Sequence, residues 1–385
     1  MSKPAKPYPE YPLTPRTDGR WQKKVRGRLH YFSGDWKEAL AEWERVRPYL
    51  LDGLEPPPPV EVGVTLGFVC NKLLNAKLAA VEAGQLAPQT FRQWKDACGR
   101  LVGAFGPGAD PSSLKPADFT RVKPQIVAGR GVHAVQKDIA TIRGVFKWAF
   151  ENEFLDRPVN FGTEFKPPRK AAMRKARREA GERMVEAHEF RDLLKEAYYR
   201  GDVRTRAVLL LGMNCAYGPT DVATLNKSHL DLENGWAEYP RPKTQADRKA
   251  ALWPETVEAL RETIKDRPRP VDPVDDDAVF LSHSGRRLVQ AVVTERQTVN
   301  TNNRVSSGFR ELADAAGIYR PGLSFYGLRR AFRTVADELL DHPTADLVMG
   351  HASGEMAAVY RQRLGEDRLR AMAEHVRKWA LGVRP

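Results

Sequence analysis

Apolar residues recur at helical spacing over long parts of the chain, most regularly between residues 63 and 155. Four segments there, 66–84, 88–106, 113–127 and 132–155, predict helices. In the last of them the i, i+3, i+4 stripe consists of Val135, Ile139, Ile142, Val145, Phe146 and Ala149. We therefore expect a compact four-helix domain over residues 56–165. Spacing alone does not separate a DNA-binding domain from a generic helical bundle.

The segment before this domain combines a short hairpin with one helix. Residues 19–31 predict two strands with a turn near Gly27, and the helical spacing that follows begins after Asp35, a typical N-cap residue. The proline-rich stretch 55–62 then predicts a linker. Residues 1–55 are thus expected to form a separate small module.

The second half of the chain returns to helical patterns, interrupted by one hairpin. Residues 186–199 predict an amphipathic helix, and residues 207–218 a buried helix that ends at Gly218. Residues 235–253 contain two strand-like runs around a polar turn. The fold class expected for the whole chain is mainly α with small β-hairpins, and residues 186–385 form an α+β domain.

The last helix, over residues 365–381, leaves two interpretations open. It carries an apolar stripe that either docks on a neighbouring protomer or packs on its own chain. The stripe consists of Leu369, Met372, Val376 and Trp379.

Charge gives the first indication of a partner. The chain of 385 residues has a formal net charge of +13, which favours a polyanion such as nucleic acid, although an excess of solvated lysine and arginine is the plain alternative. Residues 166–185 predict a basic linker, because the stretch 166–183 holds eight basic and two acidic residues. The candidate DNA-binding residues of the hairpin and the linker are Lys23, Lys24, Arg26, Arg28, Arg169, Lys170, Arg174, Lys175, Arg177 and Arg178.

Other features concern the compartment. No apolar run approaches the ~18 residues of a membrane span, and the first residues lack the apolar core of a secretory signal. The three cysteines, Cys70, Cys98 and Cys215, fit neither a disulfide framework nor a zinc site. We expect a cytoplasmic, nucleoid-associated protein with no membrane partner.

Four residues that could carry chemistry occur in a set order between residues 243 and 360. Lys243 lies in the predicted hairpin, Arg329 near the start of a helix, His351 after a glycine and Tyr360 nine positions later. Each alone has a structural interpretation, such as a turn lysine or a half-buried tyrosine. The four together, in this order, favour a functional one.

These residues resemble the C-terminal pattern of the tyrosine recombinases, the phage integrase family. The stretch GLRRAFRTVADELLDHPTADLVMGHASGEMAAVY, residues 327–360, is similar to that pattern in residue types and spacing. The resemblance implies an arm-type N-terminal module, a helical SAM-like core-binding domain and an α+β catalytic domain. It also implies double-stranded DNA as the partner and a homo-oligomer, a tetramer, on that DNA.

The resemblance assigns each residue a role. Tyr360 is the nucleophile that becomes linked to the 3′ phosphate, and Arg329 holds the non-bridging oxygens. Lys243 protonates the departing 5′ oxygen, and His351 adds a hydrogen bond or a proton relay. This chemistry needs neither ATP nor a metal, so no cofactor is expected.

Two positions depart from the family pattern. Gly218 stands where the first catalytic arginine is expected, and Tyr326 replaces the histidine of His-x-x-Arg. Arg241 is the preferred substitute cation, because strand alternation would put it on the same face as Lys243, and Arg330 is the other candidate.

Three functions follow from these residues. The first is a site-specific recombinase that inserts or excises mobile DNA. The second is a DNA-binding regulator or accessory factor that has lost catalysis through Gly218. The third, a solitary relaxing enzyme of the topoisomerase kind, is disfavoured by the arm-like module and the C-terminal helix.

Overall fold

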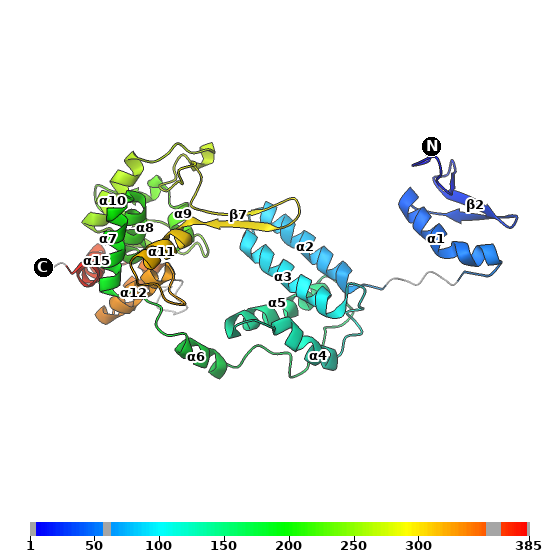
Figure 1. Ribbon diagram of the computed structural model, residues 1–385, viewed down its shortest axis with the longest axis horizontal. Coiled ribbons are helices and arrows are strands. Elements are labelled where there is room, and N and C mark those ends of the chain that lie inside the picture. Colours follow the sequence, from blue (N-terminus) through cyan, green and yellow to red (C-terminus); the bar gives the residue numbers. More distant parts are fainter. Residues whose placement is uncertain (1–4, 57–62, 352–362, 383–385) are drawn as a thin grey trace. The chain divides into compact units, whose positions relative to one another are not determined.

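The chain divides into two compact units, residues 1–65 and 66–385. The computed structural model describes residues 5–56, 63–351 and 363–382 (Figure 1). Helices dominate and the sheets are small, so the predicted fold class, mainly α with β-hairpins, is confirmed. The finer division into four domains stays a prediction.

The first unit is a three-stranded antiparallel sheet packed on one helix. Its strands pair in the order β1-β2-β3. Arg26 and Gly27, both with positive φ, form the two-residue turn between β2 and β3, as the favoured hairpin geometry requires. Asp35 caps the helix, as the sequence predicts, and it also forms a capping box with Glu38. The elements are β1 (Thr14–Pro15), β2 (Trp21–Val25), β3 (Arg28–Phe32) and α1 (Trp36–Asp52).

The second unit begins with the four expected helices, which are grouped together in Figure 1. Their apolar stripes meet in a buried core that contains Leu73, Leu101, Phe119, Ile142 and Phe146. The helices are α2 (Leu66–Glu82), α3 (Pro88–Phe105), α4 (Pro116–Val127) and α5 (Val132–Glu151).

The basic linker contains a helix that the sequence analysis did not predict, α6 (Lys170–Glu179). None of its residues is buried, so the sequence has no apolar stripe from which this helix could be predicted. Its lysines, arginines and alanines are strong helix formers, so local propensity accounts for the helix without a core. A Lys175–Glu179 ion pair at 3.7 Å, one turn apart, adds a small contribution.

The part of the chain after residue 184 has a second, larger core, from Val185 to Ala380, that is built mainly from helices. Its helices are α7 (Ala187–Tyr199), α8 (Val203–Asn214), α9 (Pro219–Thr224), α10 (Pro254–Lys265), α11 (Arg304–Ala315), α12 (Tyr326–Ala336), α13 (His342–Met349) and α15 (Glu366–Leu381). Its strands are β4 (Leu230–Asp231), β5 (Trp236–Glu238), β6 (Lys249–Ala251), β7 (Val289–Val293) and β8 (Val299–Asn303).

Two details differ from the sequence-based expectation. The buried helix α8 ends at Asn214, so the turn that follows it, not the helix, contains Ala216 and Gly218. The hairpin β7–β8 was not predicted, because the exposed strand β8 reads VNTNN and has no apolar face. Its turn accepts a 2.7 Å hydrogen bond at the Gln297 carbonyl from Lys95 of α3.

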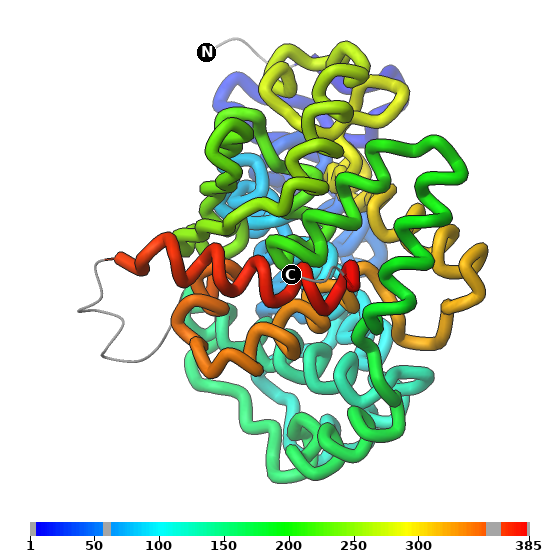
Figure 2. The backbone as a smooth tube through the Cα atoms, turned by 90° about the vertical axis from the view of Figure 1, so that its left-hand side faces the viewer, coloured from blue at the N-terminus to red at the C-terminus, as the bar shows by residue number. Residues whose placement is uncertain are grey.

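The C-terminal helix packs on its own chain. Leu369, Met372 and Val376 are buried in the larger core, and Trp379 packs against it. Figure 2 shows α15, in red, beside the orange α12 and α13, which it contacts. Of the two interpretations of this stripe, the described residues therefore support packing in cis. No helix among them is long and apolar enough to cross a membrane.

Candidate active site

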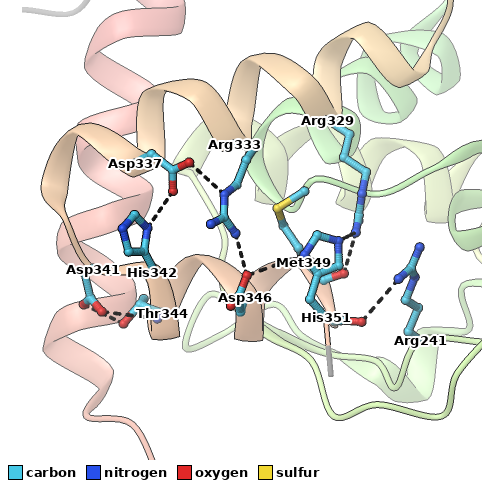
Figure 3. Close-up of polar contacts among 11 residues, drawn as sticks. Arg241, Arg329, Arg333, Asp337, Asp341, His342, Thr344, Asp346, Met349 and His351 are labelled. Carbon is cyan, nitrogen blue, oxygen red and sulfur yellow. Dashed lines mark hydrogen bonds and ion pairs between the residues drawn. The ribbon is translucent and has the colours of Figure 1, made fainter. Parts of the chain in front are cut away.

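Arg329 is the centre of the candidate site. It lies on α12, is only 5% exposed and makes three polar contacts with its guanidinium group. Nη1 donates to the Ala216 carbonyl at 2.5 Å, and Nη2 donates to the Met349 carbonyl at 2.7 Å and lies 2.9 Å from His351 Nε2 (Figure 3). Burial, with a smaller effect of the nearby Arg241, lowers the pKa of Arg329 to about 10. It therefore remains a cation at neutral pH and holds three separate segments together.

His351 follows Gly350, the residue that caps the C-terminal end of α13 in the left-handed conformation (φ 62°). Its backbone N–H donates to the Asp346 carbonyl at 2.9 Å, and its Nδ1 lies 3.5 Å from the Asp346 carboxylate. Since Arg329 can only donate, Nε2 must accept and Nδ1 carries the proton toward Asp346. Arg333 in turn pairs with Asp346 at 2.5 Å and keeps this carboxylate in place. The histidine is thus oriented from both sides.

The titration of His351 gives a first test. Burial lowers its pKa, with Arg329 and Arg241 acting in the same direction and Asp346 opposing them. We expect its ring protons to titrate, by NMR on the free protein, below the ordinary value of ~6.5. Because the folded pKa is depressed, its contribution to stability is present above the unfolded value and is lost as pH falls through the folded one. Arg241→Ala should raise this pKa. A titration at or above ~6.5, unmoved by Arg241→Ala, would contradict the geometry.

Arg241 and Lys243 belong to the loop that joins β5 and β6. The hairpin itself is confirmed, with Trp236 paired to Ala251. Residues 241–245 form a turn, in which the Thr244 and Gln245 N–H groups both donate to the Arg241 carbonyl. The expectation that strand alternation aligns Arg241 with Lys243 is therefore wrong, because neither residue is in a strand.

Arg241 nevertheless reaches the site. Its Nη1 donates to the Gly350 carbonyl at 3.4 Å, a weak hydrogen bond, and Figure 3 shows its side chain beside His351. Lys243 is exposed at the tip of the same loop. By contrast, burial lowers the pKa of Arg330, and the charges that add to this effect are those of Arg183 and Arg177.

Gly218 caps the short helix α9. Its N–H donates to Asp221 Oδ2 at 2.7 Å, and the same oxygen lies 3.4 Å from Nη1 of Arg248. Arg248 is 3% exposed, sits 4.1 Å from the centre of the Tyr217 ring and donates from Nε to the Tyr239 carbonyl. Its two terminal nitrogens are buried without a hydrogen bond among the described residues. Sequence analysis missed Arg248, since nothing in its surroundings distinguishes it from less buried neighbours such as Lys249.

The two remaining candidate residues are the tyrosines Tyr326 and Tyr360. Tyr326 begins α12 and is 48% exposed. Tyr360, the expected nucleophile, lies outside the described residues. The site therefore brings together Arg329, His351 and Arg241, and the role of each stays a prediction. Within the described ranges no cluster of three or more histidine, cysteine or acidic side chains has the arrangement of a metal site.

The candidate DNA-binding residues of the first unit point in different directions. Lys23 donates to the Pro12 carbonyl at 2.8 Å and lies over the Trp43 ring, so it faces the helix. Arg26 donates to the Leu51 carbonyl. Lys24 is exposed on the opposite, open face of the sheet, and Arg28 is exposed at the start of β3. Sequence analysis missed Arg16, which lies 5.0 Å from the centre of the exposed Tyr31 ring.

The linker candidates are mostly on α6. Lys170, Arg174, Lys175, Arg177 and Arg178 lie on this helix, and Arg169 is its N-cap residue. Arg177 is close enough to Arg330 of α12 to lower the pKa of that arginine. Helix α6 therefore carries positive charge to the same domain that contains the candidate site.

Comparisons with known proteins agree with this architecture. The sequence model of the phage integrase family matches residues 172–366, just over half of the chain. The fold is similar to a lambda integrase dimer bound to a COC′ core site (TM-score 0.53, 14% identity, 94% of this chain and 98% of that one). It is also similar to the Tn1549 transposon integrase in complex with transposon right end DNA (TM-score 0.54, 15% identity, 81% and 99%). No curated protein sequence matches the chain.

The chain belongs to the phage integrase family, and its fold is that of the tyrosine recombinases. Family and fold together support a role in site-specific DNA recombination. The resemblance in the C-terminal motif is thereby confirmed.

Proposed function

We propose that this protein is a site-specific recombinase that cleaves and rejoins double-stranded DNA through a 3′-phosphotyrosyl intermediate. The observation that carries the proposal is the Arg329 cluster. A buried cation is joined to His351 and to the carbonyls of Ala216 and Met349, with Arg241 alongside. A buried cation in a water-excluded site is well suited to stabilise charge on a phosphate.

The reaction follows from these groups. Tyr360 Oη attacks the scissile phosphorus and gives up its proton, with His351 assigned a hydrogen bond or a place in a proton relay, while the bond from phosphorus to the 5′ oxygen breaks. Lys243 gives a proton to that 5′ oxygen. Arg329 and Arg241 neutralise the non-bridging oxygens. The phosphotyrosyl bond retains the energy of the broken one, so a 5′ hydroxyl from another strand reverses the step.

Assembly on DNA extends the proposal. A lambda integrase tetramer bound to a Holliday junction has a similar fold (TM-score 0.54, 13% identity, 94% of this chain and 100% of that one). We infer that this chain also acts as a tetramer on DNA. The strands are then exchanged between protomers that each supply one nucleophile.

A second function has a specific observation in its favour. Gly218 offers only a backbone N–H where the family places an arginine, and that N–H is already bonded to Asp221. A DNA-binding regulator without catalysis would tolerate this loss. A covalent protein–DNA adduct on a nicked substrate supports the recombinase, and DNA binding without any adduct supports the regulator.

Helix α6 gives a prediction that both functions share. We expect double-stranded DNA affinity to fall with salt, and the double variant Arg174→Ala/Arg178→Ala to reduce the slope of log affinity against log salt by about 0.9 per lost phosphate contact. Fluorescence anisotropy at several salt concentrations measures this slope. Arg200→Ala, which removes a surface arginine paired with Glu196, is the matched control and should leave it unchanged. If the unaltered protein, the double variant and Arg200→Ala all have the same slope, α6 does not contact the DNA.

A further inference from the structure

The two positions at which this chain departs from the family pattern touch each other. They are 108 residues apart in sequence, yet a Cβ atom added to Gly218 would lie 3.0 Å from the Tyr326 hydroxyl and 3.1 Å from its Cζ. Asp221 Oδ2 would be 3.3 Å away on another side. The tyrosine side chain therefore lies over the glycine, in the space where a side chain at position 218 would begin.

Backbone conformation does not explain the glycine. Gly218 has φ −88° and ψ 173°, which any residue adopts without strain. What limits this position is its neighbours, because contacts near 3.0 Å are closer than ordinary packing allows. Tyr326 therefore restricts the space that is open to a side chain at position 218.

The backbone of Tyr326 has little freedom to withdraw. Its backbone begins α12, where the next residue, Gly327, is so close to the segment before α7 that an added Cβ would meet the Arg183 carbonyl at 2.9 Å. The preceding Phe325 is fully buried. Only rotation of the Tyr326 side chain could open space at 218, and that rotation would take the hydroxyl away from its present place.

The Tyr326 hydroxyl lies where it could take part in the chemistry of the site. The Tyr326 side chain is half-exposed and is one of the groups near enough to Arg329 to influence it electrostatically. A hydroxyl donates one hydrogen bond and carries no charge, whereas an arginine offers a fork of donors. It can therefore bind one phosphate oxygen but cannot neutralise it.

We propose that Tyr326 and Gly218 are a matched pair, in which the tyrosine fills the volume of the missing arginine side chain and donates its hydroxyl to a scissile-phosphate oxygen in place of that arginine. This inference rests on the proposed recombinase function. It assigns Tyr326 a catalytic role, and Arg241 then supplies the positive charge that the missing arginine would have provided. It also predicts that an arginine restored at 218 alone does not rebuild the family site.

The packing half of the inference is tested by a double-mutant cycle read by thermal unfolding. Gly218→Arg should lower Tm by about 2–6 °C, since overpacking forces Tyr326 aside. In a Tyr326→His background most of this loss should disappear. Gly308→Arg is the control for adding an arginine, because nothing lies within 4 Å of a Cβ there. Additive Tm changes for Gly218→Arg and Tyr326→His would overturn the pairing.

The chemical half is tested by Tyr326→Phe, which keeps the ring and removes only the hydroxyl. The rate of covalent capture on a nicked DNA should fall about 10²-fold, while Tm and DNA affinity stay unchanged. Tyr198→Phe, at a tyrosine that is 73% exposed, is the matched control. Capture by Tyr326→Phe at the unaltered rate would overturn the catalytic role. If Tm shows the coupling but even the unaltered protein captures no DNA, the packing stands and the recombinase function fails.

Discussion

Replacing Tyr360 by phenylalanine should abolish covalent capture of DNA while leaving binding intact. The change removes a single oxygen, the one that would attack phosphorus, and keeps the ring and all charges of the site. The loss should be complete within detection, the largest effect expected of any substitution in this chain. Denaturing gel electrophoresis after incubation with a nicked substrate measures capture, and anisotropy measures affinity.

The control for this variant is another tyrosine. Tyr319→Phe alters a residue that packs beneath Arg310, 3.1 Å from its ring, and should capture DNA normally. If Tyr360→Phe still forms the adduct, the nucleophile is elsewhere, and peptide mapping of the adduct will identify it, with Tyr326 and Tyr319 the first to examine.

Arg241→Ala should slow cleavage by ~10²-fold or more with little change in affinity, because its interaction with the phosphate strengthens in the transition state. The cost to the fold should be small, since the Arg241 side chain makes one weak hydrogen bond within the described residues, to the Gly350 carbonyl at 3.4 Å. Arg241→Lys should recover little, because a point charge does not reproduce the bidentate fork. Single-turnover cleavage rates at saturating protein measure the effect.

Arg330→Ala is the comparison that decides which cation substitutes for the missing arginine. Arg330 neighbours Arg329 in sequence but is near Arg177 and Arg183 in space, so its removal should affect binding more than the cleavage rate. Equal, unaltered cleavage by Arg241→Ala and Arg330→Ala would mean that neither one acts as a substitute clamp.

Much of the fold could be predicted from local patterns. The capping box at Asp35, the turn at Gly27 and the stripe on α5 each depend on residues within one element, so the sequence shows them directly. Helix α6 could not be predicted in this way, because it buries no residue and therefore has no apolar stripe. Only the helix propensity of its residues indicates it, and a charged stretch without a stripe is first interpreted as a linker. The same reasoning explains the polar strand β8.

The candidate site was predictable only where a motif carries it. Arg329 and His351 belong to a motif, and the structure brings them together, with Arg329 Nη2 2.9 Å from His351 Nε2. Arg248 belongs to no motif, and its burial beside Tyr217 depends on how the loop between β5 and β6 folds back. The contact between Gly218 and Tyr326 joins distant segments, and a single sequence contains no pattern that reports such a contact.

Covalent trapping of the unaltered protein is the most direct measurement of the central claim. The substrate is a suicide duplex nicked close to the cleavage point and carrying the end sequence of the element, so that the released 5′ fragment diffuses away and the adduct accumulates. The account predicts an adduct that resists denaturant, is released by protease digestion and leaves the enzyme on the 3′ phosphate. Tight, salt-dependent binding of the same duplex with no adduct would contradict it and establish the DNA-binding regulator instead.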